Sequence, residues 1–343
     1  MKQISKKLPL QGDKYSTYHI KQSIPLFLSI VLIIIILFIY RVRSGSPLND
    51  FQIKVLVNGG VALSFASVGI AAVIISGGFD ASVGSVITLI NVLAATSLRG
   101  NLIIDIPICL MLIILGTAAG FLNGFLIAYA GIQSIIATLA TNFVWFGVGL
   151  LILKEPGGYV PGWFSTFFQG TYIDSIPNSI FWILSLILFI IFFRKSKFYR
   201  SIFSIGSDPE SAYRNGINVK ITRVKVYALA GFFYGIAGLF LTAQTTSGDP
   251  NIGLPFMLLT FSAVVVGGTP FGGGKGSLFS GITGGYILRL LDSVLISVGI
   301  TSYFNDIVQG SIMLIAVVLN SRLPIIRSRI KKTNNNHEKI SRL

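Results

Sequence analysis

The chain has 343 residues, of which 52% are hydrophobic and 11% are charged, and its mean hydropathy is +0.77. Soluble globular domains contain about 25% charged residues, so this composition excludes a soluble enzyme and predicts an integral membrane protein. The 27 Lys and Arg residues exceed the 12 Asp and Glu residues, which gives a net charge of +15. On a soluble domain such an excess of positive charge would favour nucleic-acid binding. The positions of the basic residues in the sequence therefore have to be examined before a partner is inferred.

Most of the basic residues lie in three stretches, 1–22, 194–225 and 321–343, which contain 20 of the 27. Basic residues that flank membrane spans remain on the cytoplasmic side. We therefore expect a basic cytoplasmic tail over 1–23, a cytoplasmic loop over 194–224 and a second basic tail over 321–343. The basic residues then set the orientation in the membrane, and a nucleic-acid partner is not needed to explain them.

Apolar segments long enough to cross a hydrocarbon core of ~30 Å recur through the region 24–320. We predict ten spans, at 24–40, 54–76, 84–99, 102–127, 132–153, 179–193, 225–246, 256–270, 277–299 and 303–320. The first is longer than a signal-peptide core of about 7–15 residues, so we expect a retained anchor. An even number of spans puts both termini in the cytoplasm and the loop 154–178 outside. The predicted fold is an all-α integral membrane protein with about ten transmembrane helices.

Polar residues interrupt the apolar sequence between the second and third predicted spans. Asp80, Ser82 and Ser85 lie among glycines there, and Asn123 lies within a later apolar segment. A carboxylate at membrane depth costs at least ~2.5 kcal/mol, so we expect it to pair, cap a helix or face water. Two interpretations remain open. Either Ser82 or Asp80 caps the helix that begins near Gly84, or a substrate path for a hydroxylated solute is lined by Asp80, Ser82, Ser85 and Asn123.

The segments 72–89 and 263–282 resemble each other. Each has an apolar β-branched run, then Gly-Gly, then a polar break, then Gly-Ser at the start of a new apolar run. Paired interruptions in corresponding halves of a transporter indicate discontinuous helices and a substrate pathway. We therefore predict an internal repeat with two interrupted helices.

Glycines recur at helical spacing in several predicted spans, at Gly116, Gly120 and Gly124, at Gly231 and Gly235, and at Gly281 and Gly285. Small residues at this spacing allow membrane helices to approach closely. We expect a compact helix bundle. The sequence leaves open whether these glycine ladders pack helices within the chain or form a contact between two subunits.

The predicted cytoplasmic loop contains a helix signal at Asp208-Pro209-Glu210. Proline is favoured in the first helical turn, and acidic residues there interact favourably with the helix dipole. Glu210, Ala212 and Gly216 match the Glu-Ala-Ala-x-x-x-Gly pattern of permease loops that dock on an ATPase. The alternative is a helix that only ends at a glycine. The docking interpretation assigns ATPase coupling to Asp208, Glu210, Ala212 and Gly216.

The glycine cluster at 272–277 does not predict a nucleotide site. A Walker A loop requires Ser or Thr directly after Gly-Lys to hold Mg²⁺, whereas Gly276 follows Lys275. We expect no cofactor in this chain, so ATP and Mg²⁺ at a partner subunit, or an ion gradient, would supply the energy. Cys109 is the only cysteine, and His19 and His337 are the only histidines, so neither a disulfide nor a metal site is predicted.

Four stretches of this chain resemble motifs of the permease subunits of bacterial ABC importers for sugars, the ribose, galactose and xylose type. The stretches occur along the chain in the same order as in that family. They are 77–85, 120–124 with 135–139, 206–219, and 265–269 with 272–277. The resemblance covers roughly 55–320 and implies a ten-helix, channel-forming subunit of the bacterial inner membrane that is not an enzyme. It also implies three kinds of partner: ATP-binding subunits, a second permease that is identical or similar, and an external sugar-binding protein.

Two departures from this family pattern leave the sugar unidentified. Phe79 and Ala81 flank Asp80, where the family usually has Gly-Gly-Ile-Asp-Leu-Ser, and the stretch 255–259 lacks an acidic residue that many members carry. The main alternative is an ion-coupled secondary transporter of a small polar solute. Few ionisable residues lie within the predicted spans, which disfavours that alternative. A non-transporting membrane scaffold is the second alternative.

Overall fold

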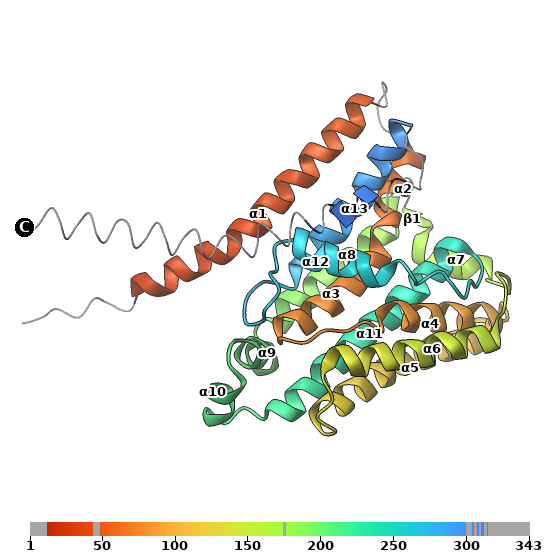
Figure 1. The fold of residues 1–343 in the computed structure, drawn as a ribbon. Coiled ribbons are helices and arrows are strands. Elements are labelled where there is room, and N and C mark those ends of the chain that lie inside the picture. Colours follow the sequence, from red (N-terminus) through yellow and green to blue (C-terminus); the bar gives the residue numbers. More distant parts are fainter. Residues whose placement is uncertain are drawn as a thin grey trace, which may run out of the picture.

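The computed structural model describes residues 12–43, 49–173 and 176–299, together with six positions between 304 and 314. Figure 1 shows the arrangement of the helices. The first half contains α1 (Gly12–Arg43), α2 (Asp50–Gly59), α3 (Val61–Ile75), α4 (Val83–Ser97), α5 (Leu102–Ala128) and α6 (Ser134–Ile152). The second half contains α7 (Gly162–Gln169), β1 (Thr171–Ile173), β2 (Ile176–Pro177), α8 (Ser179–Phe193), α9 (Lys197–Ser207), α10 (Pro209–Arg214), α11 (Val219–Thr245), α12 (Phe256–Val266) and α13 (Phe279–Ser297).

Helices α3 and α11 form the centre of the described structure. Every residue of α3 is buried, and α11 contributes four of the largest fully buried side chains, Tyr227, Phe233, Tyr234 and Phe240. Helix α11 packs on α3, α4 and α5, while α13 packs on α1, α3 and α12. A helix that is apolar all round is typical of a central position in a membrane bundle. The other helices therefore surround this pair.

The glycine ladders pack helices within the chain. A Cβ atom on Gly116 of α5 would lie 2.7 Å from the carbonyl oxygen of Gly231 and 3.0 Å from the Cα of Gly235, both on α11. Gly281 and Gly285 of α13 face the backbone of α3 in the same way. Larger side chains at these positions would separate the helices. The structure thus answers the question that the spacing left open.

Every predicted span between 24 and 299 overlaps a helix, and the tenth, 303–320, lies mostly outside the described residues. Among the described residues, five helical segments are long and apolar enough to cross a membrane, or six if α8 and α9, bent by 77°, are taken together. Helices α4 and α12 have 15 and 11 residues, or about 22 and 16 Å of length, which is less than the ~30 Å of hydrocarbon. The structure is that of a multi-pass α-helical membrane protein, and the number of spans stays a prediction.

The segment between α6 and α8 differs from the all-α expectation because it contains a short antiparallel pair of strands. In this pair Thr171 lies opposite Pro177 and Ile173 opposite Ile176. The strands and α7 lie at the opposite end of the molecule from α10 (Figure 1). The placement of 154–178 and 194–224 on opposite sides of the membrane stays a prediction.

The turn between α4 and α5 is fixed by a buried carboxylate. Asp105 accepts hydrogen bonds from the N–H groups of Arg99 and Gly100 at 2.8 and 2.9 Å, and from the indole N–H of Trp163 at 3.2 Å. A buried carboxylate is tolerated when several donors satisfy it. Asp105 therefore stabilises this turn and its contact with α7, which explains one of the few ionisable residues in the apolar sequence.

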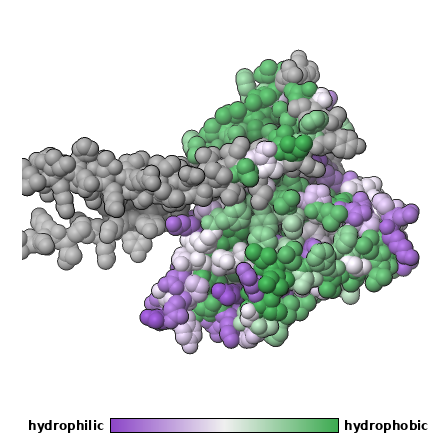
Figure 2. Space-filling view, viewed as in Figure 1, coloured by the Kyte–Doolittle hydropathy of each residue, from purple (hydrophilic) through white to green (hydrophobic). Residues whose placement is uncertain are grey.

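The outer faces of the bundle are apolar. In α5 and in α6, only 22% of the most apolar stretch is buried, whereas 89% of the corresponding stretch of Asp50–Ile75 is buried. Figure 2 shows hydrophobic surface over most of the visible body, with hydrophilic surface at the lower left, where Figure 1 places α9 and α10. Exposed apolar faces of this kind suit contact with lipid or with another membrane subunit.

Candidate functional site

The polar break predicted after α3 is a structural interruption between α3 and α4. Helix α3 ends at Ile75, Gly77 adopts a left-handed φ of 80°, and the N–H of Gly78 donates to the carbonyl of Val73 at 3.0 Å. This is the Schellman arrangement that ends many helices, and it favours glycine because a Cβ is disfavoured at positive φ. The chain then crosses residues 76–82 before α4 begins at Val83.

Asp80 is the centre of a buried polar cluster in this interruption. One carboxylate oxygen accepts from the Ser82 hydroxyl at 2.6 Å and from the Ser82 N–H at 2.9 Å. The other accepts from the hydroxyl of Tyr234 on α11 at 3.2 Å. Asp80, Ser82 and Tyr234 are each 0% exposed. A carboxylate buried in this way is stable only when its oxygens are satisfied, and here three donors do so.

Of the two capping candidates, Ser82 does not cap α4 with its side chain. It occupies the N-cap position, but its hydroxyl donates to Asp80, accepts from the amide of Asn123 and makes no cap hydrogen bond. Asp80 instead accepts the Ser82 N–H, two residues along the chain. The Asp80 carboxylate thus fixes the backbone just before α4. Of the two candidates, Asp80 and not Ser82 makes a side-chain hydrogen bond to the backbone there.

The cluster extends to α5 and α6. The amide of Asn123 donates to the Ser82 hydroxyl at 2.8 Å and accepts from the hydroxyl of Thr141 at 2.6 Å. The hydroxyl of Thr138 accepts from the N–H of Ala81 at 3.0 Å. These contacts join the interruption to two further helices, so the polar residues form one network and not separate features.

Three of the four residues predicted to line a substrate path, Asp80, Ser82 and Asn123, are joined by side-chain hydrogen bonds. The Ser85 hydroxyl donates instead to the backbone carbonyl of Ser82, one helical turn back, at 2.9 Å. All four residues are at most 3% exposed, so in this structure they are closed off from solvent.

Four members of this neighbourhood were not identified from the sequence: Thr138, Thr141, Tyr227 and Tyr234. The hydroxyl of Tyr227 donates to the carbonyl of Phe79 at 3.0 Å, close to the contact of Tyr234 with Asp80. The two tyrosines are seven residues apart, or about two helical turns, so they lie on one side of α11. That spacing was a usable signal for two hydroxyls that reach adjacent residues of the interruption, Phe79 and Asp80.

A cavity of about 350 Å³ lies beside the interruption. Its lining combines apolar residues with hydroxyl, amide and guanidinium groups from four segments, among them Ser76, Gln133, Ser134, Arg223 and Tyr227. Tyr227 belongs both to this lining and to the contact with Phe79. The cavity therefore abuts the buried cluster of Asp80 without including it.

The second predicted interruption, between α12 and α13, ends its first helix in the same way. Gly268 has φ of 99°, and the N–H of Thr269 donates to the carbonyl of Val264 at 3.0 Å. The Thr269 hydroxyl accepts from the N–H of Ser277 at 3.0 Å and donates to the hydroxyl of Ser280 at 2.8 Å. The two segments that resemble each other in sequence therefore share a helix ending.

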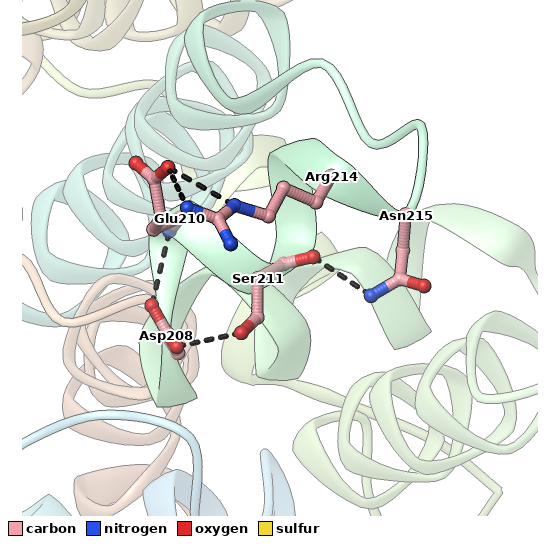
Figure 3. Close-up of polar contacts among 5 residues, drawn as sticks. All are labelled: Asp208, Glu210, Ser211, Arg214 and Asn215. Atoms are coloured by element: carbon pink, nitrogen blue, oxygen red, sulfur yellow. Dashed lines mark hydrogen bonds and ion pairs between the residues drawn. The ribbon is translucent and has the colours of Figure 1, made fainter.

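The predicted loop helix is present as α10, with Asp208 at its N-cap and Pro209 in its first turn. The Asp208 carboxylate accepts from the Glu210 N–H at 3.0 Å and from the Ser211 hydroxyl at 2.7 Å, as Figure 3 shows. The helix ends before Gly216, whose φ is 81°. The sequence signals for both ends of this helix are confirmed.

Helix α10 presents charged residues to solvent and an apolar residue to its neighbours. Arg214 and Glu210 form an ion pair at 3.1 Å with side chains that are 75% and 72% exposed, so the pair adds little stability. Ala212 is buried. A groove of about 440 Å³ runs between α9 and α10, with lining residues that include Phe203, Ala212 and Ile217. The groove is also lined by hydroxyl, carboxylate and amide groups, those of Ser204, Ser207, Asp208, Ser211 and Asn215. The site is thus an exposed helix beside a groove of mixed polarity, which suits protein docking.

The Ser211 hydroxyl, by its hydrogen bond to Asp208, holds the pKa of this exposed carboxyl below its ordinary value. The carboxyl therefore stays ionised at neutral pH, as an N-cap beside the positive end of a helix requires. Within the part of the chain that the structure describes, no group of three His, Cys, Asp or Glu side chains is placed to hold a metal ion.

Comparison with known proteins gives a consistent picture. The family model described as the permease component of branched-chain amino acid transport systems matches residues 53–317. The galactose/methyl galactoside import permease protein of Salmonella typhimurium is 31% identical over 312 residues, which cover 85% of this chain and 92% of that protein. The ribose import permease protein of Bacillus subtilis is 30% identical over 314 residues, which cover 88% of this chain and 94% of that protein.

A further relative, the D-allose transport system permease protein of Escherichia coli, is 30% identical over 251 residues, which cover 72% of this chain and 76% of that protein. No solved structure matches the chain. The family model spans well over half of the sequence and includes both interruptions and α10. The chain therefore belongs to this family of transport-system permease components, so it is a membrane transport subunit and not an enzyme.

Proposed function

We propose that this chain is the permease subunit of an ATP-driven ABC importer in a bacterial inner membrane, and that it carries a sugar or sugar-like solute. The observation that carries the proposal is about 30% identity to galactose, ribose and allose permeases over most of the chain. The two interrupted helices support it, since such interruptions are typical of solute pathways. The description of the family model favours one competing solute class, branched-chain amino acids.

Uptake by reconstituted vesicles tests the solute class. The permease is combined with candidate ATP-binding subunits and an external binding protein, and labelled galactose, ribose, allose and leucine are offered separately. We expect ATP-dependent accumulation of at least one sugar and none of leucine. Accumulation of leucine alone would replace the sugar with an amino acid. Sugar uptake that needs no ATP would restore the secondary-transporter interpretation.

We propose that α10 docks on an ATP-binding subunit, with Asp208, Glu210, Ala212 and Gly216 forming or ordering the contact. The helix is exposed, capped at both ends and flanked by a groove that combines apolar and polar lining residues. It lies in a strongly basic segment that we expect to be cytoplasmic. A docked helix of this kind would carry movement from the ATPase into the membrane domain.

The variant Glu210→Lys tests this docking. It removes the exposed ion pair, which contributes little to stability, but it reverses a charge on the proposed contact. We expect ATP hydrolysis without solute uptake, or loss of ATPase binding. Glu155→Lys is the matched control, because it makes the same charge change on an exposed residue of the opposite loop. Normal coupled transport by Glu210→Lys would remove α10 from the docking site.

We also propose that Asp80, Ser82, Ser85 and Asn123 belong to the solute path. Because these side chains are buried here, this role requires a second conformation in which the cluster opens. Ser82→Cys and Asn123→Cys, made in a Cys109→Ser background that leaves no other thiol, should react with small water-soluble thiol reagents only during ATP turnover. Protection in every transport state would limit the cluster to a structural role.

We propose that a second permease, identical or similar, completes the pore. The chain carries no Walker A motif, so it needs at least the ATP-binding subunits, and its apolar outer faces leave room for a membrane partner. The mass of the complex in lipid nanodiscs decides the number of permeases. A complex with one permease and full ATP-dependent uptake would contradict a paired pore.

A further inference from the structure

Three segments that are far apart in sequence meet where α3 and α9 end. The N–H of Gly274, in the loop after α12, donates to the carbonyl of Ile75 at the end of α3, at 2.8 Å. Gly206, in the last turn of α9, lies against both: a Cβ atom there would overlap the Ile75 carbonyl and lie 2.6 Å from the Gly274 nitrogen. The end of α9 thus touches both helix interruptions at once.

This contact is made by backbone atoms because glycines occupy its key positions. A Cβ on Gly273 would lie 2.5 Å from the carbonyl oxygen of Gly206 and 2.9 Å from the Cα of Gly77. A Cβ on Gly274 would lie 2.7 Å from the Cα of Ser207. Closely packed groups of low compressibility transmit displacement, whereas long flexible side chains would absorb it. We call Gly206, Gly273 and Gly274 the glycine junction.

The glycine junction continues directly into α10. Ser207, which contacts Gly274, is followed by Asp208, the N-cap of α10. On the other side of α10, helix α11 holds the first interruption through the hydrogen bond from Tyr227 to Phe79. The N-terminal end of α10 is therefore connected to both interruptions through the glycine junction. Its C-terminal end is connected to the first interruption through α11 and Tyr227.

We propose that the glycine junction transmits displacement of α10 to the two helix interruptions, so that Gly206, Gly273 and Gly274 are positioning residues for coupled transport. The inference rests on the proposed docking of an ATP-binding subunit on α10. Movement of α10 shifts the end of α9, which displaces the end of α3 and the loop at 272–276 together. Both interruptions then change in one step, because Gly206 contacts the end of α3, while Gly273 and Gly274, which belong to the second interruption, contact both α9 and the first interruption.

The test uses the complete reconstituted importer and measures solute uptake and ATP hydrolysis in the same vesicles. We expect Gly206→Ala and Gly273→Ala to lower the ratio of solute transported to ATP hydrolysed by roughly tenfold, while hydrolysis continues. A role in stability alone would lower the amount of folded complex without changing this ratio. An unchanged ratio in both folded variants overturns the proposal.

Two matched controls separate coupling from packing and from loop strain. Gly231→Ala introduces a methyl group into an equally close backbone contact between α5 and α11, away from α10. It should lower stability and leave the ratio unchanged. Gly272→Ala lies in the same loop at φ of 111° but meets no atom within 4 Å, so it should also leave the ratio unchanged. A ratio lowered as much by Gly272→Ala would assign the effect to the loop backbone.

Hydrogen exchange of the wild-type importer gives a second readout in case Gly206→Ala does not fold. Binding of a non-hydrolysable ATP analogue should change amide exchange in three peptides together, those containing Ile75, Ser207 and Gly274. A change limited to α10 would overturn the proposal. If the wild type shows no ATP-dependent uptake, the proposed function fails first. If Glu210→Lys uncouples transport and the junction variants do not, only this inference fails.

Discussion

The two helix interruptions share a backbone design and differ in what holds them. Each begins with a Schellman ending at a glycine of positive φ, Gly77 or Gly268. The first then contains a buried carboxylate whose partners are Ser82, at the N-cap of α4, and Tyr234 on α11. The second contains hydroxyl contacts around Thr269, several glycines with positive φ and the hydrogen bond from Gly274 to Ile75. A similar sequence pattern therefore produced similar helix ends, while the chemistry between the helices diverged.

Because their side-chain contacts differ, the two interruptions are expected to differ in rigidity. Asp80 connects the first interruption to α11. Opening this interruption would therefore expose several polar groups or leave them without hydrogen-bond partners. Thr269 bonds only within its own segment, to Ser277 and Ser280. Side-chain hydrogen bonds thus hold the first interruption more firmly than the second, which is held mainly by the backbone contacts of its glycines.

The largest expected effect comes from removing the anchor of the first interruption. Asp80→Ala leaves the buried hydroxyl of Tyr234 and the Ser82 groups without their acceptor, so we expect a loss of about 2–4 kcal/mol in unfolding free energy. Thr269→Val in the second interruption should cost about 1 kcal/mol. Denaturant unfolding of the purified permease in mixed micelles measures both. Equal losses would contradict the comparison.

A smaller effect tests whether the helix endings are equivalent. Gly77→Ala and Gly268→Ala each place a Cβ at positive φ, which costs about 1–2 kcal/mol, and the two losses should be similar. Gly147→Ala, inside α6 with no atom within 4 Å, is the control of opposite sign, with an expected gain of about 0.5–1 kcal/mol. The same unfolding measurement applies. A loss at only one ending would show that the two do not share their geometry.

The contact between the first interruption and α12 is expected to have a smaller energy. Phe79, from the first, stacks on Phe261 of α12 with ring centroids 4.3 Å apart. A double-mutant cycle with Phe79→Leu and Phe261→Leu should give a coupling energy of about 0.5–1.5 kcal/mol. Phe79→Leu combined with Phe65→Leu, whose ring stacks on Phe240 instead, should be additive. A coupling energy of zero for the first pair would show that this stack does not connect the first interruption to α12.

The smallest effect is a pH dependence confined to α10, outside both interruptions. Because the folded pKa of Asp208 is lowered, its cap contributes stability above the ordinary aspartate pKa of about 3.9 and loses it as pH falls through the lower folded value. Hydrogen exchange of residues 210–214, corrected for intrinsic rates, should keep its protection down to about pH 4. Ser211→Ala should move the loss of protection to higher pH. The exchange of peptides from both interruptions should not follow this titration.

Local features of the sequence predicted most of the helices. Every predicted apolar segment between 24 and 299 overlaps a helix, and the signals at Asp208, Pro209 and Gly216 predicted both ends of α10, whereas α7 and α9 were not predicted. Local hydrogen bonds decide such features, since caps and helix endings involve residues within five positions of one another. The two short strands escaped prediction because they are only three and two residues long.

The sequence by itself determined that this chain is a helical membrane protein with two interrupted helices and a capped loop helix, because composition and local spacing contain that information. Only the tertiary structure decided that the glycine ladders face one another inside the chain and that Asp80 pairs with Tyr234, 154 residues away. It also decided that Gly206 meets Gly274 and the end of α3. The physical reason is that these contacts join backbones and side chains across long separations, and no local pattern specifies which helix will supply the partner.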